Sequence, residues 1–509
     1  KFAEVATGSL GQGLSIGVGM ALAAKLDKLP YITYVLIGDS EASEGSTWEA
    51  VELASYYKLN NLVGIIDVNR LGQSGQTMLG WDVETYRRRV EAFGWQALVI
   101  DGHDFGQIVK VFDSIKSGGG KPQMIIAKTV KGRGVSFLED KEGWHGRALS
   151  EEDFKKALKE LGEVDKSIRG EIARPVSSIK YQVLRKNTKY KIQNTKYGLG
   201  EMVATRLAYG ETIAKLGASN PDIVVLDAEV KNSTYAEIFK EKYPERFYEM
   251  FIAEQNMVGV ALGMSKRGKI PFVSTFATFF TRAFDQIRMT AYSRGNVKFV
   301  GSHAGVSIGE DGPSQMGLED IALFRAIQGS VVLCPADAVA CERLVEAVAN
   351  HDGICYMRTA RPATPVVYDQ SEEFKIGGSK AIRSGDNDRV TVVACGVTLI
   401  EAIKAADELS GQNISVRVID AYSIKPIDEV SLKKAAGETN NLVVTVEDHY
   451  FEGGLGDAVL NVFAQDAKIK VYKLAVSKIP RSGKSGELLD YEGISQKAIV
   501  KKVIEVLGQ

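Results

Sequence analysis

The sequence predicts an α/β protein of three domains, and three observations carry this prediction. The chain has 509 residues, which suits about three domains of roughly 150 residues each. Apolar runs of strand length alternate with helical stretches along most of the chain. Residues 150–200 change in composition, as in a helix followed by a polar linker that includes Lys186–Lys191. We therefore expect domains at residues 1–185, 200–370 and 385–509.

Bulk composition excludes several classes of function. Hydrophobic residues make up 45% and charged residues 25% of the chain, as in soluble globular proteins. The net charge of −1 predicts no nucleic-acid partner, and the cluster Tyr86–Arg89 is interpreted as a solvated helix face. No apolar run approaches 18 residues and no secretory signal is visible, so no membrane association is expected. Four cysteines without CxxC or zinc spacing predict a reducing, cytoplasmic location.

The first chemically informative stretch is the glycine-rich loop Gly8–Gly13, which leads into a predicted helix at residues 14–24. Glycine tolerates positive φ and allows a ligand to approach the backbone closely. A helix that begins at such a loop favours an anion. The loop therefore predicts a phosphate-facing position, although it does not match G-x-G-x-x-G and is weak evidence alone.

Asp39 and Asn69 follow two predicted strands, at residues 31–37 and 62–68. They lie 69 − 39 = 30 positions apart, about one strand–helix–strand unit. Parallel strands bind ligands at their carboxyl ends, so we expect both side chains at that edge. With the Leu71 carbonyl, these oxygens suit Mg²⁺, which fills its shell with water and phosphate oxygens. The alternative is a helix-capping Asp39 and a turn-forming Asn69, and this pattern alone leaves the two interpretations nearly even.

The rest of the first domain adds a helix at residues 46–58 and strands at residues 97–100 and 123–127. The last strand runs into a loop rich in Lys and Gly. There Lys131 is a candidate clamp for a diphosphate, as a flexible point charge. His145 follows in a Trp-His-Gly turn, where a lone histidine is more often solvated or structural.

The second domain is predicted to start with a helix near Thr205, followed by strands at residues 223–227 and 247–251. The aromatic run Phe272–Gln286 carries polar residues between its rings, as a pocket wall does, although such runs usually belong to a core. The loop Gly309–Gln315 contains two acids and a glutamine, which suits sugar hydroxyls. An ordinary turn is the alternative, and the residues alone favour it.

Cations are expected where an anionic substrate end binds, because guanidinium groups hold phosphate well. The candidates are Arg206, Arg358 and Arg361, with Ser233. The third domain is predicted from strands at residues 390–396, 415–420 and 442–447 that alternate with helices. The last strand runs into Asp448-His449, which looks catalytic at first sight.

Seven segments, in order along nearly the whole chain, resemble the transketolase family. Their sequences are most similar to those of its animal-type members. They are Thr7–Gly13, Gly38–Glu41, Asn69–Gln73, Lys131–Gly134, Ile252–Asn256, Ser274–Gln286 and Gly309–Gln315. The resemblance implies two thiamine diphosphate-binding parallel-sheet domains and a C-terminal α/β domain. It also implies thiamine diphosphate and Mg²⁺ as cofactors, with Ca²⁺ or Mn²⁺ as substitutes, and a homodimer with active sites at the subunit interface.

The implied reaction is reversible transfer of a two-carbon ketol group between sugar phosphates in the pentose phosphate pathway. The donor is a ketose phosphate such as xylulose 5-phosphate. The acceptor is an aldose phosphate such as ribose 5-phosphate or erythrose 4-phosphate. Two alternatives stay open: a non-catalytic or partner-dependent transketolase-like subunit, and a related thiamine diphosphate-dependent synthase.

Site residues carry over where the segments match. The implied metal ligands are Asp39, Asn69 and Leu71, and the implied catalytic residues are Glu254, His145 and His303. The implied cofactor contacts are Gly8, Leu10, Ser40, Glu41, Asn69, Gln73, Lys131, His145, Glu254, Phe276, Phe279, Arg282 and Gln315. The implied substrate contacts are Arg206, Ser233, His303, Asp311, Arg361 and His145.

The family pattern also assigns chemistry. Glu254 would hold N1′ of the aminopyrimidine, which requires an apolar pocket that raises the pKa of its carboxyl group. His145 and His303 would move protons at sugar oxygens, a task that suits a pKa near operating pH. Glu44 matches an interface glutamate. His449 is interpreted as structural, since the family's third domain lies away from the thiamine site.

Three departures from the family pattern stand out. Ser40 replaces the commonest glycine near the diphosphate, and we expect little change because its backbone N–H remains. Arg147 follows Trp-His-Gly where the close relatives usually have lysine, which keeps charge but not geometry. The family's N-terminal part is missing by roughly a hundred residues. We expect truncation, processing or a split gene, the last with a second chain that supplies this segment.

Overall fold

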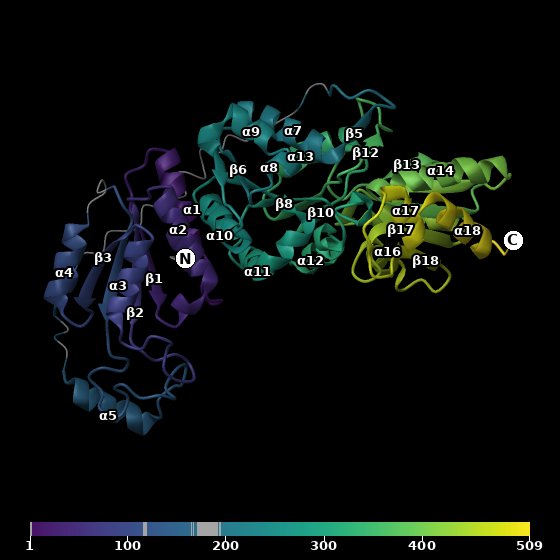
Figure 1. The fold of residues 1–509 in the computed structure, drawn as a ribbon. Helices are drawn as coiled ribbons and strands as arrows, with labels where there is room; N and C mark the ends of the chain where they lie inside the picture. Colours follow the sequence, from purple (N-terminus) through teal and green to yellow (C-terminus); the bar gives the residue numbers. More distant parts are fainter. Residues whose placement is uncertain are drawn as a thin grey trace. The chain divides into compact units, whose positions relative to one another are not determined.

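The computed structural model describes residues 3–115, 120–163, 165, 167–170, 192 and 195–508. The chain forms two compact units (Figure 1): residues 6–186 with 266–268, and residues 1–5, 187–265 and 269–509. Helix α5 (Glu151–Leu161) confirms the helix predicted after residue 150. The predicted linker residues 186–191 lie outside the described residues.

The first unit is built on a parallel sheet of strand order β1-β2-β4-β3. Its strands are β1 (Thr33–Gly38), β2 (Leu62–Val68), β3 (Gln96–Asp101) and β4 (Gln123–Lys128). Its helices are α1 (Gly13–Leu26), α2 (Gly45–Tyr56), α3 (Val83–Ala92), α4 (Phe105–Ser114) and α5. Helix α1 packs closely on β1, since a Cβ on Gly17 would lie 2.4 Å from Val35 Cγ2. The four predicted strands and parallel order are thus confirmed.

The second unit contains a sheet of order β16-β10-β11-β9-β8-β6-β7, parallel except for β16. Its strands are β6 (Ile223–Asp227), β7 (Phe247–Glu249), β8 (Ile270–Phe276), β9 (Lys298–Ser302), β10 (Val331–Leu333), β11 (Cys355–Arg358) and β16 (Ser423–Lys425). Its helices are α7 (Thr205–Ser219), α8 (Lys231–Thr234), α9 (Glu237–Lys242), α10 (Glu254–Lys266), α11 (Phe284–Tyr292), α12 (Asp320–Ala326) and α13 (Ala338–Asn350). A small antiparallel pair joins β5 (Met202–Ala204) to β12 (Ala363–Pro365).

The same unit contains a further sheet of order β13-β15-β14-β17-β18, in which only β13 is antiparallel. Its strands are β13 (Lys380–Arg383), β14 (Val390–Ala394), β15 (Val416–Asp420), β17 (Leu442–Tyr450) and β18 (Lys470–Val476). Its helices are α14 (Val397–Gly411), α15 (Glu429–Glu438), α16 (Leu455–Phe463), α17 (Ser485–Glu492) and α18 (Gln496–Val506). Figure 1 shows these elements in green and yellow around the C-terminus.

The structure differs from the predictions at several strands. Strand β7 ends at Glu249, two residues before the predicted end, and Phe251 already has a φ of 55°. Strand β17 extends to Tyr450, so Asp448 and His449 belong to a strand and not to a loop. Strand β16 was not predicted: it follows β15 of the last sheet but pairs with β10 of the preceding one.

None of the helices formed by the described residues combines the length and the apolarity that crossing a bilayer requires.

Strand β16 supplies a lysine whose ammonium group caps the C-terminal end of α12. Lys425 Nζ donates to the Arg325 carbonyl at 2.9 Å, the Ile327 carbonyl at 2.5 Å and Ser330 Oγ at 3.1 Å.

Replacing Lys425 with Met keeps the stem but removes the ammonium donor. We expect the free energy of unfolding to fall by about 2–3 kcal/mol, measured by urea denaturation. Lys433→Met removes only an exposed pair with Glu429 and should change it by less than about 0.5 kcal/mol; equal losses would contradict the capping role.

Candidate functional site

The predicted metal ligands gather at the carboxyl edge of the first sheet. Asp39 and Asn69 each follow a strand end, and the parallel register sets Gly38 beside Asp67. The Asp39 carboxylate, 2% exposed, accepts the Arg70 N–H at 2.8 Å. Burial raises the pKa of the Asp39 carboxyl group, while hydrogen bonds oppose that rise. Asp39 therefore faces the backbone of the Asn69–Leu71 turn.

The side chain of Asn69 is held in one orientation. Its Nδ2 donates to Asp67 Oδ2 at 2.9 Å, and its Oδ1 accepts the Leu71 N–H at 3.1 Å. The Leu71 carbonyl accepts Lys131 Nζ at 3.3 Å, and Lys131 Nζ lies 3.0 Å from His145 Nδ1. The structure thus brings these five predicted residues, Asp39 included, into one connected group.

This donor set fits Mg²⁺ by its chemistry, because a carboxylate, an amide oxygen and a carbonyl are hard oxygen ligands. Among the described residues, no three His, Cys, Asp or Glu side chains cluster as a metal site. The predicted set does not require such a cluster, since Asp39 is its only residue of those types.

The glycine-rich loop is tied to the same edge by Glu41. Its two carboxylate oxygens accept the Gly11 N–H at 2.9 Å and the Gly38 N–H at 3.1 Å. The backbone N–H of Ser40 donates to Asp39 Oδ1 at 2.9 Å. The remaining predicted cofactor contacts of this unit, Gly8, Leu10 and Gln73, are exposed.

A second group of predicted residues lies in the other unit. Glu254 begins α10 and is 4% exposed. Its Oε1 accepts Arg282 Nη1 at 2.9 Å, so a charged partner joins the aromatic residues at this carboxylate. The rings of Phe276 and Phe279 stack with centroids 5.4 Å apart and an interplanar angle of 6°. Arg282 also lies 5.0 Å from the Phe279 ring centroid.

His303 stacks on Phe276 of this aromatic pair, with its ring centroid 3.8 Å from that of Phe276. Its Nδ1 lies 2.9 Å from Ser302 Oγ, and its Nε2 lies 4.0 Å from Asp311 Oδ2. Burial, followed by the charges of Arg206 and Arg361, lowers the pKa of His303 to about 3. The expectation that its pKa lies near operating pH was therefore wrong, and His303 is neutral at pH 7.

Two of the three candidate arginines border this histidine. Arg361 Nη1 lies 3.3 Å from Asp311 Oδ1 and donates to the Ile308 carbonyl at 2.7 Å. Arg206 Nη1 donates to the Ser233 carbonyl at 2.7 Å, and burial lowers the pKa of its guanidinium group. Its Nε is buried and has no hydrogen-bond partner among the described residues. Gln315 ends a short 3₁₀ turn in the neighbouring loop.

The third candidate cation, Arg358, has other partners. Its guanidinium group is buried and donates to both Asp320 carboxylate oxygens, at 2.9 and 3.2 Å. It also donates to the carbonyls of Gly317 and Asp448, each at 2.8 Å. These partners occupy the donors that a phosphate would need, so Arg358 is a structural cation.

Sequence reasoning missed two residues that hold Asp39. Thr77 Oγ1 donates to Asp39 Oδ2 at 3.0 Å, and Tyr86 Oη donates to the Asp39 carbonyl at 3.3 Å. Arg87 and Arg88 pair with Glu84, as expected for a solvated face. Tyr86, however, is buried. The spacing of four between Tyr86 and the buried Val90 was a signal for an inward face.

Known proteins similar to this chain match it over nearly its whole length. Family models described as the transketolase thiamine diphosphate binding domain, pyrimidine binding domain and C-terminal domain match residues 1–198, 201–366 and 379–499. The chain is 50% identical to transketolase-like protein 2 of Mus musculus over 505 residues, covering 99% of the chain and 80% of that relative. It is 47% identical to transketolase of Homo sapiens over 504 residues, with the same coverage. Transketolase of Campylobacter jejuni shares the fold, with a TM-score of 0.84 at 23% identity, covering 99% of this chain and 83% of that one. The chain therefore belongs to the transketolase family and has its three-domain fold.

Proposed function

We propose that this chain catalyses reversible transfer of a two-carbon ketol group from xylulose 5-phosphate to ribose 5-phosphate or erythrose 4-phosphate, as in the pentose phosphate pathway. The observation that carries the proposal is the setting of Arg206. Its guanidinium group is partly buried, and its buried Nε has no hydrogen-bond partner among the described residues. Arg361, Asp311 and a neutral His303 lie nearby. Two cations with polar groups suit the phosphate and hydroxyls of a sugar.

The proposed cofactors are thiamine diphosphate and Mg²⁺, for which Ca²⁺ or Mn²⁺ would substitute. Asp39, Asn69 and Leu71 would hold the metal ion, and Lys131 and His145 would face the diphosphate. Thiamine diphosphate, when bound, supplies the nucleophilic carbon and the electron sink for breaking a carbon–carbon bond. The match to a thiamine diphosphate binding domain supports this choice.

The chain's own residues then orient and move protons. Glu254 would hold a proton at N1′ of the aminopyrimidine, beside Phe276 and Phe279. Because His303 is neutral, it would accept a proton from a sugar hydroxyl or donate a hydrogen bond, and it would not act as an imidazolium acid. Arg206 and Arg361 would fix the phosphate end of the sugar, which sets the distance to the reacting carbonyl.

We further propose a homodimer in which the diphosphate half-site of one subunit and the pyrimidine half-site of its partner form each active site. All four cysteines, Cys334, Cys341, Cys355 and Cys395, are buried and free. This supports a reducing, cytoplasmic location. A second chain is proposed only as the source of any catalytic group that this chain lacks.

The alternative proposal is a transketolase-like subunit without activity of its own. It is favoured by the similar identity to a transketolase-like protein and to a transketolase, 50% and 47%. A ketol-transfer assay with this chain, thiamine diphosphate and Mg²⁺ separates the two. Turnover of xylulose 5-phosphate with ribose 5-phosphate supports the enzyme. Cofactor binding without turnover supports the partner-dependent subunit, and turnover only with a pyruvate donor supports a related synthase.

Replacing Glu254 with Gln tests cofactor activation. The amide keeps the shape but removes the proton-sharing carboxyl group, so kcat should fall on the order of 10²–10⁴-fold while thiamine diphosphate still binds. Steady-state kinetics and fluorescence titration measure the two effects. Glu245→Gln, at a side chain that is 63% exposed, should leave kcat unchanged. Full activity of Glu254→Gln would refute the assigned role.

Replacing Asp39 with Asn tests the metal site. Loss of the single carboxylate should raise the Mg²⁺ concentration needed for half-maximal thiamine diphosphate binding by about 10–100-fold. Titration of Mg²⁺ at fixed thiamine diphosphate, after removal of metal with a chelator, measures this. The matched control is Asp101→Asn at the end of β3, which lies outside the group and should not shift the titration. An unshifted Asp39→Asn curve would exclude Asp39 as a ligand.

Because the pKa of His303 is low, we expect the free energy of unfolding to depend on pH. Its pKa is about 3 in the folded chain and about 6.5 in an unfolded chain. The unfolded state therefore binds the proton more readily below pH 6.5, and stability is lost as pH falls through this range. Between pH 7 and pH 5, wild type should lose about 1–2 kcal/mol more unfolding free energy than His303→Gln. Equal losses in urea titrations at the two pH values would contradict a buried neutral His303.

A further inference from the structure

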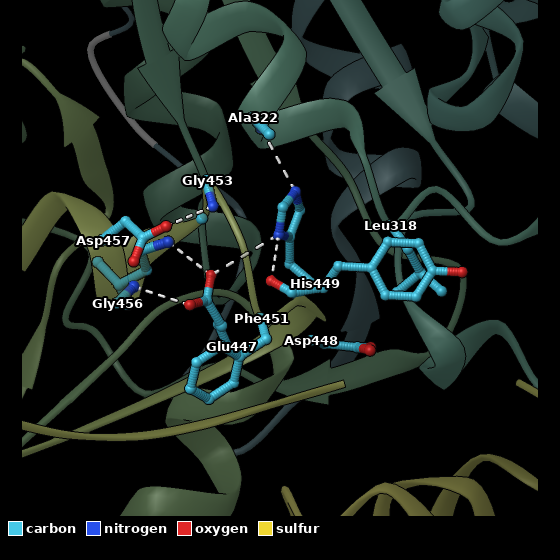
Figure 2. Close-up of polar contacts among 12 residues, drawn as sticks. Leu318, Ala322, Glu447, Asp448, His449, Phe451, Gly453, Gly456 and Asp457 are labelled. Atoms are coloured by element: carbon cyan, nitrogen blue, oxygen red, sulfur yellow. Dashed lines mark hydrogen bonds and ion pairs between the residues drawn. The ribbon is translucent and has the colours of Figure 1, made fainter. Parts of the chain in front are cut away.

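Strand β17 carries three consecutive buried polar residues, Glu447, Asp448 and His449, which are 0%, 2% and 0% exposed. Successive side chains of a strand point to opposite faces. Figure 2 accordingly shows Glu447 and His449 directed toward one another, with Asp448 extending away from them. Glu447 Oε1 accepts the Gly456 N–H of α16 at 2.7 Å, and His449 Nε2 accepts the Ala322 N–H of α12 at 3.3 Å.

Asp448 instead contacts the segment that follows His303. Its Oδ1 accepts the Val306 N–H at 2.7 Å, and its Oδ2 accepts the Ser307 N–H at 3.0 Å. The Asp448 carbonyl accepts Arg358 Nη2 at 2.8 Å. The side chain and backbone of Asp448 thus connect β17 of the last sheet to a loop and a strand of the preceding sheet.

The carboxylate lies tightly against this loop. Gly305 has a φ of 83°, and a Cβ built on it would lie 2.1 Å from Asp448 Oδ2. A glycine is therefore required at this position. The Gly305 N–H also donates to the Gly317 carbonyl at 2.7 Å. The backbone of residues 304–307 is consequently held by the Asp448 carboxylate and by the Gly317 carbonyl.

This loop links three groups of the proposed sugar-phosphate site. His303 precedes it, with a φ of 55°. Arg361 donates to the Ile308 carbonyl at 2.7 Å. Asp311 follows and lies 3.3 Å from Arg361 and 4.0 Å from His303. A shift of the loop backbone would therefore displace the imidazole and loosen a guanidinium contact together.

We infer that Asp448 is a positioning residue for ketol transfer, acting from the C-terminal domain through the Val306–Ser307 backbone on His303, Asp311 and Arg361. This inference rests on the proposed function for its kinetic consequence. It changes the expected role of the third domain, which the sequence resemblance sets apart from the chemistry. Asp448 itself touches no reacting atom in this assignment.

The chain offers a matched control in Glu447, one residue before Asp448. It is equally buried and also accepts two backbone N–H groups, those of Leu455 and Gly456. These belong to α16 and not to the His303 loop. Glu447→Gln and Asp448→Asn therefore remove comparable buried contacts, and only the second should affect the loop.

The experiment compares both variants of the full chain with thiamine diphosphate and Mg²⁺. Three quantities are measured: the thermal unfolding midpoint, kcat and KM for xylulose 5-phosphate and ribose 5-phosphate, and hydrogen exchange of a peptide spanning residues 304–312. For Asp448→Asn we expect exchange to accelerate by about 10-fold or more and kcat/KM to fall by about 10–100-fold, with a raised KM. For Glu447→Gln we expect both quantities within about twofold of wild type, even at an equal shift of the midpoint.

Two outcomes overturn the inference: wild-type exchange and kcat/KM in Asp448→Asn, or parallel losses of kcat/KM and midpoint in both variants. If wild type has no turnover, the proposed function fails separately. The exchange comparison then decides the positioning role alone, since slow exchange retained in Asp448→Asn refutes it and selective acceleration supports it.

Discussion

The buried guanidinium group of Arg358 holds the second unit together where its two large sheets meet. It joins Asp320 of α12, the carbonyl of Gly317 and the carbonyl of Asp448 on β17. Tyr356 Oη adds a donor to Asp320 at 2.5 Å. Desolvating such a charge is costly, and removing one partner of a buried pair costs about 3–5 kcal/mol because the other stays unpaired. Through the Asp448 carbonyl, this centre is joined to the strand whose side chains hold the loop after His303 and contact α12.

The two groups of predicted site residues have opposite electrostatic arrangements. At the edge of the first sheet, the Asp39 carboxylate is held by backbone and hydroxyl donors so that its oxygens are oriented in advance. In the other unit, Arg206 and Arg361 both lie near His303, and the buried Arg206 Nε has no hydrogen-bond partner among the described residues. The first arrangement favours a divalent cation with its phosphates, and the second an anion. In each arrangement, neighbouring groups hold the charged side chains in place before a ligand binds. Such preorganisation lowers the free-energy cost of ordering the site on binding.

Local sequence patterns predicted the elements whose signals are local. Strand β2 covers the predicted residues 62–68, because a strand buried on both faces reads as a continuous apolar run. The edge position of Asp39 and Asn69 followed from the apolar runs of β1 and β2, although Tyr34 and Leu36 of β1 are exposed. The role assigned to Glu254 came from resemblance to a family, whereas the position of Lys131 in a glycine-rich loop after a strand already made it a candidate clamp. The pairing of Arg358 with Asp320 spans 38 positions, so no local sequence pattern indicates it. The burial of His303 depends on the packing of Phe276, which comes from β8.

Strand β16 has a consequence for how this polypeptide can be divided. Its residues leave the last sheet after β15, pair with β10 of the preceding sheet, and return to form β17. A cut between the second and third domains would strip β10 of its neighbour and expose a parallel sheet edge to association with other chains. Fragment complementation, domain exchange and circular permutation should therefore treat residues 200–508 as one module. Chimeras between family members would have to exchange both sheets together.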